Sequence, residues 1–160
     1  MTLVREAVPL PFPGRLQENG YVSFRVAGVW LALPVARVQE VLGARTLTPV
    51  PLATPFLAGL LNLRGEIVSV IDLRHRLGLP PRDGGRASFH VVVRDGDELF
   101  ALQVDEVGDV VEATAEEIDE APSTLPETLR RCAPRVIRRE GGLLLAALVD
   151  ELLSPCDAGC

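Results

Sequence analysis

Short runs of apolar residues, several of which alternate with polar ones, recur along the chain and predict β-strands. The clearest run covers residues 67–73, where β-branched side chains predominate, as is typical of a largely buried strand. A second apolar run at 60–63 precedes it, and Arg64-Gly65-Glu66 lies between the two. Because Gly65 can adopt the positive φ of a tight connection, this stretch predicts a hairpin with Arg64 fixed at its corner. The planar guanidinium would suit a carboxylate or a partner's backbone there, although an ordinary surface turn also explains the pattern.

Similar patterns predict strands elsewhere, although a different spacing interrupts them in two places. Residues 35–42 carry apolar side chains at helical spacing and predict a short amphipathic turn, and residues 150–153 predict a last helical turn. The pattern as a whole indicates an all-β protein with about eight to ten strands and little helix. The further strands are expected over residues 21–26, 29–33, 89–94, 98–104, 135–139 and 143–149.

Proline and glycine divide the chain into segments. Residues 1–19 predict an irregular Pro-rich N-terminal arm, residues 20–153 a folded domain, and residues 154–160 a C-terminal tail. Inside the domain, a Pro-Pro-Arg-Asp-Gly-Gly cluster predicts an internal boundary near residues 80–86.

The two halves of the domain resemble each other. Residues 30–38 align with residues 99–107 at an offset of 69, which pairs alanine with alanine, leucine with leucine and valine with valine. Near the ends of the halves, residues 70–72 align with residues 148–150 at an offset of 78. Alternating strands can match by chance, but the shared order of the segments favours two similar β lobes. A groove between two lobes is a common place for a partner to bind.

Composition narrows the possible functions. Apolar residues make up 48% of the 160 residues, which suits one domain or two small lobes, and the formal net charge of −6 argues against a nucleic-acid binder. All sixteen basic residues are arginine, so the chain lacks the lysine of a Schiff-base nucleophile or a phosphate loop. No apolar run approaches the roughly 20 residues of a membrane span, and the N-terminus lacks the layout of a signal peptide. We therefore expect a cytoplasmic protein without direct membrane insertion.

The cysteines do not indicate a metal site or a disulfide framework. Cys132 stands alone in the sequence, and Cys156 and Cys160 lie in the C-terminal tail. A structural zinc site would need about four ligands in paired short spacings, which these residues do not provide. We expect no metal and no cofactor.

An enzyme is the main alternative to a binding protein. Asp105, Glu106 and Asp109 could form a metal or acid–base cluster, and His75 or His90 could act as a general base. However, twelve acidic residues and no basic residue lie between positions 95 and 127, and such a run is typical of a solvated face. Neither histidine has a nearby serine or cysteine to activate. The sequence therefore favours a protein without catalytic activity.

Three blocks of sequence resemble the CheW family of chemotaxis coupling proteins, over roughly residues 20–153. The blocks are Val38-Gln39-Glu40-Val41, Asn62-Leu63-Arg64-Gly65 and Val70-Ile71-Asp72-Leu73-Arg74. The resemblance implies a fold of two intertwined lobes, each a five-stranded, SH3-like β-barrel, with short helical turns. It also implies a non-catalytic adaptor that couples chemoreceptor tips to the regulatory domain of a CheA-type histidine kinase, and that is recruited to receptor arrays at the inner membrane through these partners.

The resemblance also implies which residues form the binding sites. We expect Glu40 and Arg64 to pair across the first lobe, and Val38 to be exposed beside the groove where the receptor docks, although its periodicity alone also suits a core position. We expect Gly59 to allow a close backbone approach by the kinase. The expected site residues are Val38 and Asn62 for the receptor, Glu40 and Arg64 as the coupling pair, and Gly59 and Gly65 for the kinase.

A second hypothesis is a stand-alone sensor. In this case the groove between the lobes would take a small metabolite, and the protein would bind neither kinase nor receptor.

Overall fold

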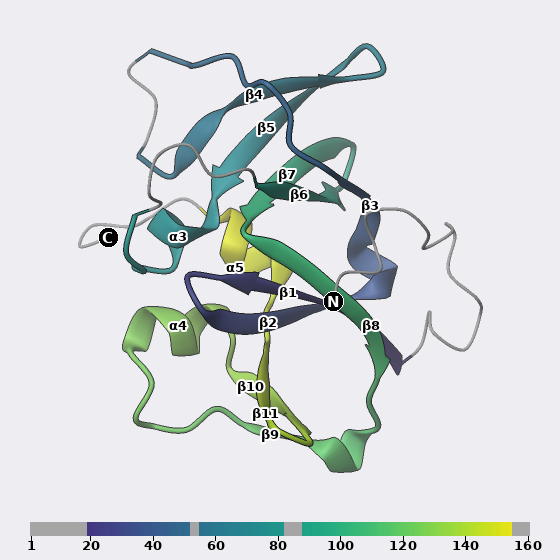
Figure 1. Ribbon diagram of the computed structural model, residues 1–160, viewed down its shortest axis with the longest axis vertical. Coiled ribbons are helices and arrows are strands. Elements are labelled where there is room, and N and C mark those ends of the chain that lie inside the picture. The colour runs from purple at the N-terminus through teal and green to yellow at the C-terminus, as the bar shows by residue number, and fades with distance from the viewer. Residues whose placement is uncertain (1–18, 52–54, 82–87, 155–160) are drawn as a thin grey trace.

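The computed structural model describes residues 19–51, 55–81 and 88–154, which form eleven strands and a few short helices arranged in two lobes (Figure 1). The upper lobe in Figure 1 is built on a five-stranded sheet with the strand order β3-β6-β7-β5-β4. We call it the five-stranded lobe. Its strands are β3 (Val38–Leu42), β4 (Leu57–Leu63), β5 (Glu66–Asp72), β6 (Phe89–Asp95) and β7 (Glu98–Val104).

The lower lobe in Figure 1 is built on a six-stranded sheet with the strand order β8-β1-β2-β11-β10-β9. We call it the six-stranded lobe. Its strands are β1 (Gly20–Val26), β2 (Val29–Pro34), β8 (Glu106–Glu112), β9 (Ile118–Glu120), β10 (Arg135–Arg139) and β11 (Gly142–Ala146). The expected all-β class is confirmed, but the lobes have six and five strands rather than five each.

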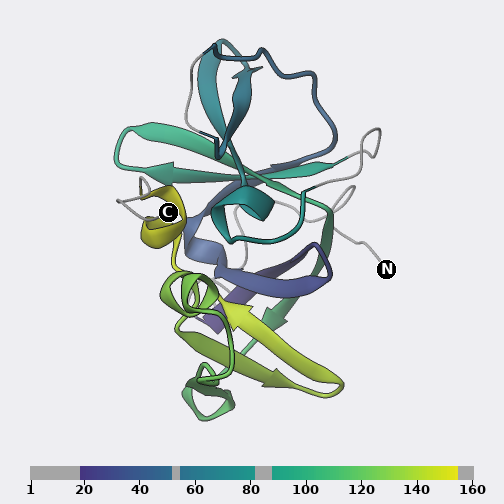
Figure 2. The same ribbon diagram turned by 90° about the vertical axis from the view of Figure 1, so that its left-hand side faces the viewer.

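Short helices lie at the ends of strands (Figure 2). Local chemistry explains why α3 starts where it does, because the side chain of Asp72 accepts a hydrogen bond from the backbone N–H of Arg74 at 3.0 Å and so caps the helix. The last helix lies where the sequence predicts a helical turn. The helices are η1 (Val35–Arg37), α3 (Leu73–Arg76), η2 (Ala115–Glu117), α4 (Glu127–Cys132) and α5 (Val149–Leu153).

The largest apolar core lies between the two sheets. Phe24 and Leu31 of the six-stranded lobe and Val93 and Leu102 of the five-stranded lobe belong to this one cluster, and all four are fully buried. Separate apolar clusters fill the interior of each lobe. Because burial of apolar area is the main stabilising term, the shared core should hold the lobes together as one unit.

The internal similarity expected from the sequence is confirmed, and its first offset is correct. The bounds of β1 and β6 differ by 69 residues. The first five strands of the six-stranded sheet, β8-β1-β2-β11-β10, correspond in order to the strands β3-β6-β7-β5-β4 of the other sheet. The second offset is wrong by two residues. Val70 pairs with Ala101 and Ala146 with Ala32, so Val70 corresponds to Ala146 at an offset of 76.

One other expectation is wrong, and three elements were not predicted. Only residues 35–37 of the expected turn over 35–42 are helical, because the rest forms β3. The acidic stretch between positions 95 and 127 contains β8, η2 and β9, which the sequence pattern did not predict. The stretch near 80–86 falls between the two copies of the repeat, since β1 to β5 precede it and β6 to β11 follow it. The change from one sheet to the other occurs elsewhere, because the chain leaves the six-stranded sheet after β2 and returns to it at β8.

Candidate functional site

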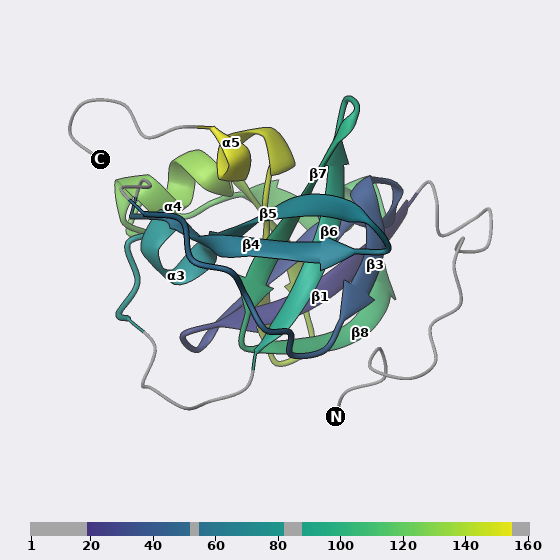
Figure 3. The same ribbon diagram turned by 90° about the horizontal axis from the view of Figure 1, so that it is seen from above.

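An ion pair between Glu40 and Arg64 joins opposite edges of the five-stranded lobe. Glu40 lies on β3, one edge of the sheet, and Arg64 lies in the turn between β4 and β5 at the other edge (Figure 3). The Nη2 atom of Arg64 donates to both carboxylate oxygens of Glu40, at 2.5 and 2.9 Å. The expected pairing is confirmed. The Glu40 side chain is only 19% exposed, whereas the Arg64 side chain is 69% exposed, so the guanidinium is open to a partner.

The turn that carries Arg64 has a defined geometry. Arg64 and Gly65 have φ values of 51° and 89°, the left-handed pair typical of a two-residue hairpin turn. The side-chain oxygen of Asn62 accepts a hydrogen bond from the backbone N–H of Gly65 at 2.9 Å and so fixes the turn. Glu40 raises the pKa of the Arg64 guanidinium through its hydrogen bond and its charge. Arg64 is therefore a fully charged group on a preorganised corner.

Val38 does not lie where its expected role requires. Only 8% of this residue is exposed, and it packs in the core between the lobes, opposite Val93 of β6. The expected exposure is wrong because residue 38 begins a strand instead of continuing a helical turn, which directs its side chain toward the core. Asn62, by contrast, is exposed.

The two glycines have different surroundings. Gly59 has a φ of +154°, and a Cβ atom there would lie 2.8 Å from the carbonyl oxygen of Thr48 and 3.2 Å from Cβ of Leu47. The close approach expected at Gly59 is thus made by the chain's own residues 47–48, and Gly59 itself is buried. Gly65 is exposed, and nothing lies within 4 Å of the position of its Cβ.

Sequence reasoning missed a partly buried polar cluster at the passage between the lobes. Asp105, between β7 and β8, accepts from Nη2 and Nε of Arg74 at 2.6 and 3.3 Å and from the backbone N–H of Ala27 at 2.7 Å. Arg74 also donates to the backbone carbonyls of Pro80 and Pro81. Arg74 stands in one of the blocks quoted above, but only the fold reveals Asp105 as its partner.

Three of the side chains that suggested catalysis make structural contacts. Asp105 pairs with Arg74, and Glu106 forms an ion pair with Arg25 at 3.0 Å. His90 is buried, with Nδ1 3.3 Å from the carbonyl oxygen of Gly43. Among the described residues, no His, Cys, Asp or Glu side chains gather in a group of three that could hold a metal ion.

Comparison with known proteins identifies the family to which this two-lobed chain belongs. The family model of the CheW-like domain matches residues 20–154, a span that includes both lobes. This chain belongs to the CheW-like family. The resemblance inferred from the three sequence blocks is thereby confirmed.

Individual CheW relatives agree with the family assignment over most of their length. Chemotaxis protein CheW of Bacillus subtilis is 30% identical over 123 residues, which cover 77% of this chain and 79% of the relative. The probable chemotaxis protein CheW of Rhizobium etli is 25% identical over 141 residues, which cover 88% and 91%. The crystal structure of the scaffolding protein TtCheW from Thermoanaerobacter tengcongensis matches with a TM-score of 0.76 at 25% identity, over 86% of this chain and 93% of that one. The two-lobed fold is therefore that of CheW scaffolding proteins.

One further feature could contribute to a partner contact. Ile67, beside the Arg64 turn on β5, is 61% exposed and places a large apolar side chain on the surface.

Among the described residues, no helix has the length and apolar character needed to cross a membrane.

Proposed function

We propose that this chain is a non-catalytic adaptor that couples chemoreceptors to a CheA-type histidine kinase in chemotaxis signal transduction. The observation that carries the proposal is the family match over residues 20–154, which takes in both lobes and the Glu40–Arg64 pair. The relatives named chemotaxis protein CheW and the solved scaffolding protein support it. No observation favours the stand-alone sensor.

The kinase contact is proposed for the turn between β4 and β5. Arg64 offers a preorganised guanidinium, Gly65 leaves the backbone open to close approach, and exposed Ile67 adds apolar area. A charged rim around an apolar contact gives both specificity and affinity. Gly59 contributes indirectly, because its close approach to Thr48 sets the path of β4.

The receptor contact is proposed for the neighbouring surface of the same lobe. Asn62 is exposed there, and half-buried Val41 packs on the same core cluster as Val38. Val38 would then support the surface from below instead of touching the receptor. Recruitment to receptor arrays at the membrane would follow from these contacts alone.

A co-sedimentation assay tests the proposal. Receptor cytoplasmic fragments assembled on vesicles should retain the purified kinase only when this protein is present. Ile67→Ser should weaken kinase retention because it removes exposed apolar area at the turn. Leu148→Ser is the matched control, since Leu148 is 45% exposed but lies just before α5, outside the five-stranded sheet. Kinase retention that is independent of this protein would refute the adaptor role.

A further inference from the structure

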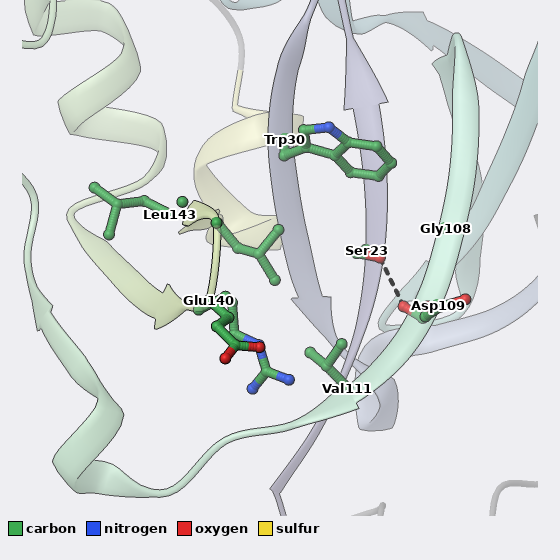
Figure 4. A pocket seen from close by; sticks show the side chains of 11 residues that line it. Ser23, Trp30, Gly108, Asp109, Val111, Glu140 and Leu143 are labelled. Carbon is green, nitrogen blue, oxygen red and sulfur yellow. Dashed lines mark hydrogen bonds between the residues drawn. The ribbon is translucent and has the colours of Figure 1, made fainter. Parts of the chain in front are cut away.

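A cavity of about 430 Å³ opens in the six-stranded lobe, whereas the Arg64 turn belongs to the five-stranded lobe. Figure 4 shows the cavity from close by. Strands β1, β2 and β8 form one wall, and the hairpin of β10 and β11 forms the other. Its lining combines an aromatic ring, two acidic residues, one arginine, a hydroxyl and apolar side chains. Those used below are Ser23, Trp30, Asp109, Glu140 and Leu143.

The correspondence between the lobes shows what occupies the equivalent place in the five-stranded lobe. The offset of 69 carries Glu40 to Asp109, and the offset of 76 carries Arg64 to Glu140. Both edge strands also have an irregularity at this point, between Val38 and Glu40 in β3 and in the β1–β8 pairing opposite Ser23. One lobe thus has a carboxylate that is paired with a guanidinium from its own hairpin. The other has carboxylates at both positions.

The same correspondence identifies a smaller side chain in the lining. Ser23, which lines the cavity, stands in the six-stranded lobe where Val92 stands in the five-stranded lobe. The cavity wall therefore carries a small polar side chain where the other lobe has a buried valine.

We propose that this cavity receives an arginine side chain of a partner protein. Its guanidinium lies between Asp109 and Glu140, in the place that Arg64 takes beside Glu40 in the other lobe. The ring of Trp30 provides a face for cation–π contact. The apolar lining covers the methylene stem of the arginine.

Two arginines of the chain itself lie near the cavity, but neither takes the position proposed for the partner's arginine. Arg139 donates to the backbone carbonyl of Glu112 at 3.2 Å, which directs it toward the end of β8. Arg25 lies 5.9 Å from the centre of the Trp30 ring and forms an ion pair with Glu106. The cavity lining therefore has two acidic residues, Asp109 and Glu140, and one basic residue, Arg139, so one negative charge is left in excess.

The rim favours an arginine carried by a protein over a free small molecule. Leu143 is 46% exposed beside the cavity and offers an apolar contact to residues that flank the arginine. Nothing lies within 4 Å of the Cβ positions of Gly141 and Gly142, so a second backbone can approach the hairpin closely. In the five-stranded lobe, too, the guanidinium is presented by a protein turn.

Fluorescence of Trp30 tests the proposal directly, because Trp30 is the one tryptophan of the chain. The probe is the blocked peptide acetyl-Gly-Leu-Arg-Gly-amide, titrated at constant ionic strength into the full chain. We expect a saturable change in emission. The same peptide with citrulline in place of arginine keeps the shape but loses the charge, and should bind several-fold more weakly.

Variants then assign the effect to the two carboxylates. Glu140→Arg should abolish binding, because the hairpin then supplies its own guanidinium to Asp109. Asp109→Asn should weaken binding several-fold, and Arg139→Gln should strengthen it by removing a competing cation. Glu127→Gln is a matched loss of charge on α4, outside the cavity lining, and should leave binding unchanged. Thermal melts confirm that each variant is folded.

Three results would overturn the proposal. They are no saturable change with the arginine peptide, equal binding of the citrulline peptide, and unchanged binding in folded Glu140→Arg. Agmatine that binds as tightly as the peptide would overturn the assignment to a protein-borne arginine.

Discussion

Single residues of the five-stranded lobe serve either its core or its surface, and burial decides which role each can have. Val38 and its neighbour Gln39 illustrate the difference, because Val38 is buried against the other lobe and Gln39 is exposed at the irregularity in β3. A substitution at Val38 therefore changes the stability of the protein before it can change any contact with a partner.

Val38→Asp should be strongly destabilised. The carboxylate would enter an apolar cluster without a charge partner, at a cost on the order of 3 kcal/mol or more in the free energy of unfolding. Gln39→Asp introduces the same side chain at an exposed position and should change this free energy by less than about 0.5 kcal/mol. Urea unfolding measures both. Equal midpoints for the two variants would show that Val38 is not a core residue.

Strand identity along the chain could be predicted wherever apolar and polar residues alternate clearly. The hairpin around Arg64-Gly65 follows from β-branched runs and a turn glycine, and its ion pair with Glu40 follows from the family resemblance. Strand β8 was missed because acidic side chains interrupt its apolar alternation. It is revealed only by its pairing with β1, from Arg25–Glu106 to Gly20–Glu112, about which the local pattern says nothing. For the same reason the Arg74–Asp105 contact could not be predicted.

At the scale of elements, Asp105 fixes the passage from β7 to β8 against α3 and the β1–β2 turn. Asp105→Ala should lower the free energy of unfolding by about 3 kcal/mol, because it leaves the largely buried guanidinium of Arg74 without this carboxylate. Asp119→Ala removes half of an exposed ion pair with Arg138 and should cost less than about 1 kcal/mol. Chemical denaturation separates the two values, and similar costs would contradict a structural role for Asp105.

In the whole molecule, the two lobes are interleaved along the chain. Residues 20–34 and 106–146 build one sheet and residues 38–104 build the other, with a shared apolar core between them. The repeat could be predicted from the sequence, and the family resemblance implied intertwined lobes. The apolar pattern alone could not show which strands are exchanged, because equivalent strands fit either sheet. The shared core predicts one cooperative unfolding transition for both lobes.

The Glu40–Arg64 ion pair lies at the turn for which the kinase contact is proposed. Arg64→Glu would place a second carboxylate beside Glu40, so the turn and β3 would repel each other and a kinase contact at the turn would be lost. We expect kinase retention to fall in Arg64→Glu and to recover in part when Glu40→Arg is added, because the double variant restores opposite charges across the same two edges. Titration of the purified kinase regulatory domain, with melts as a folding control, measures both effects. The pair would have no role in coupling if the folded double variant bound no better than the weaker single variant.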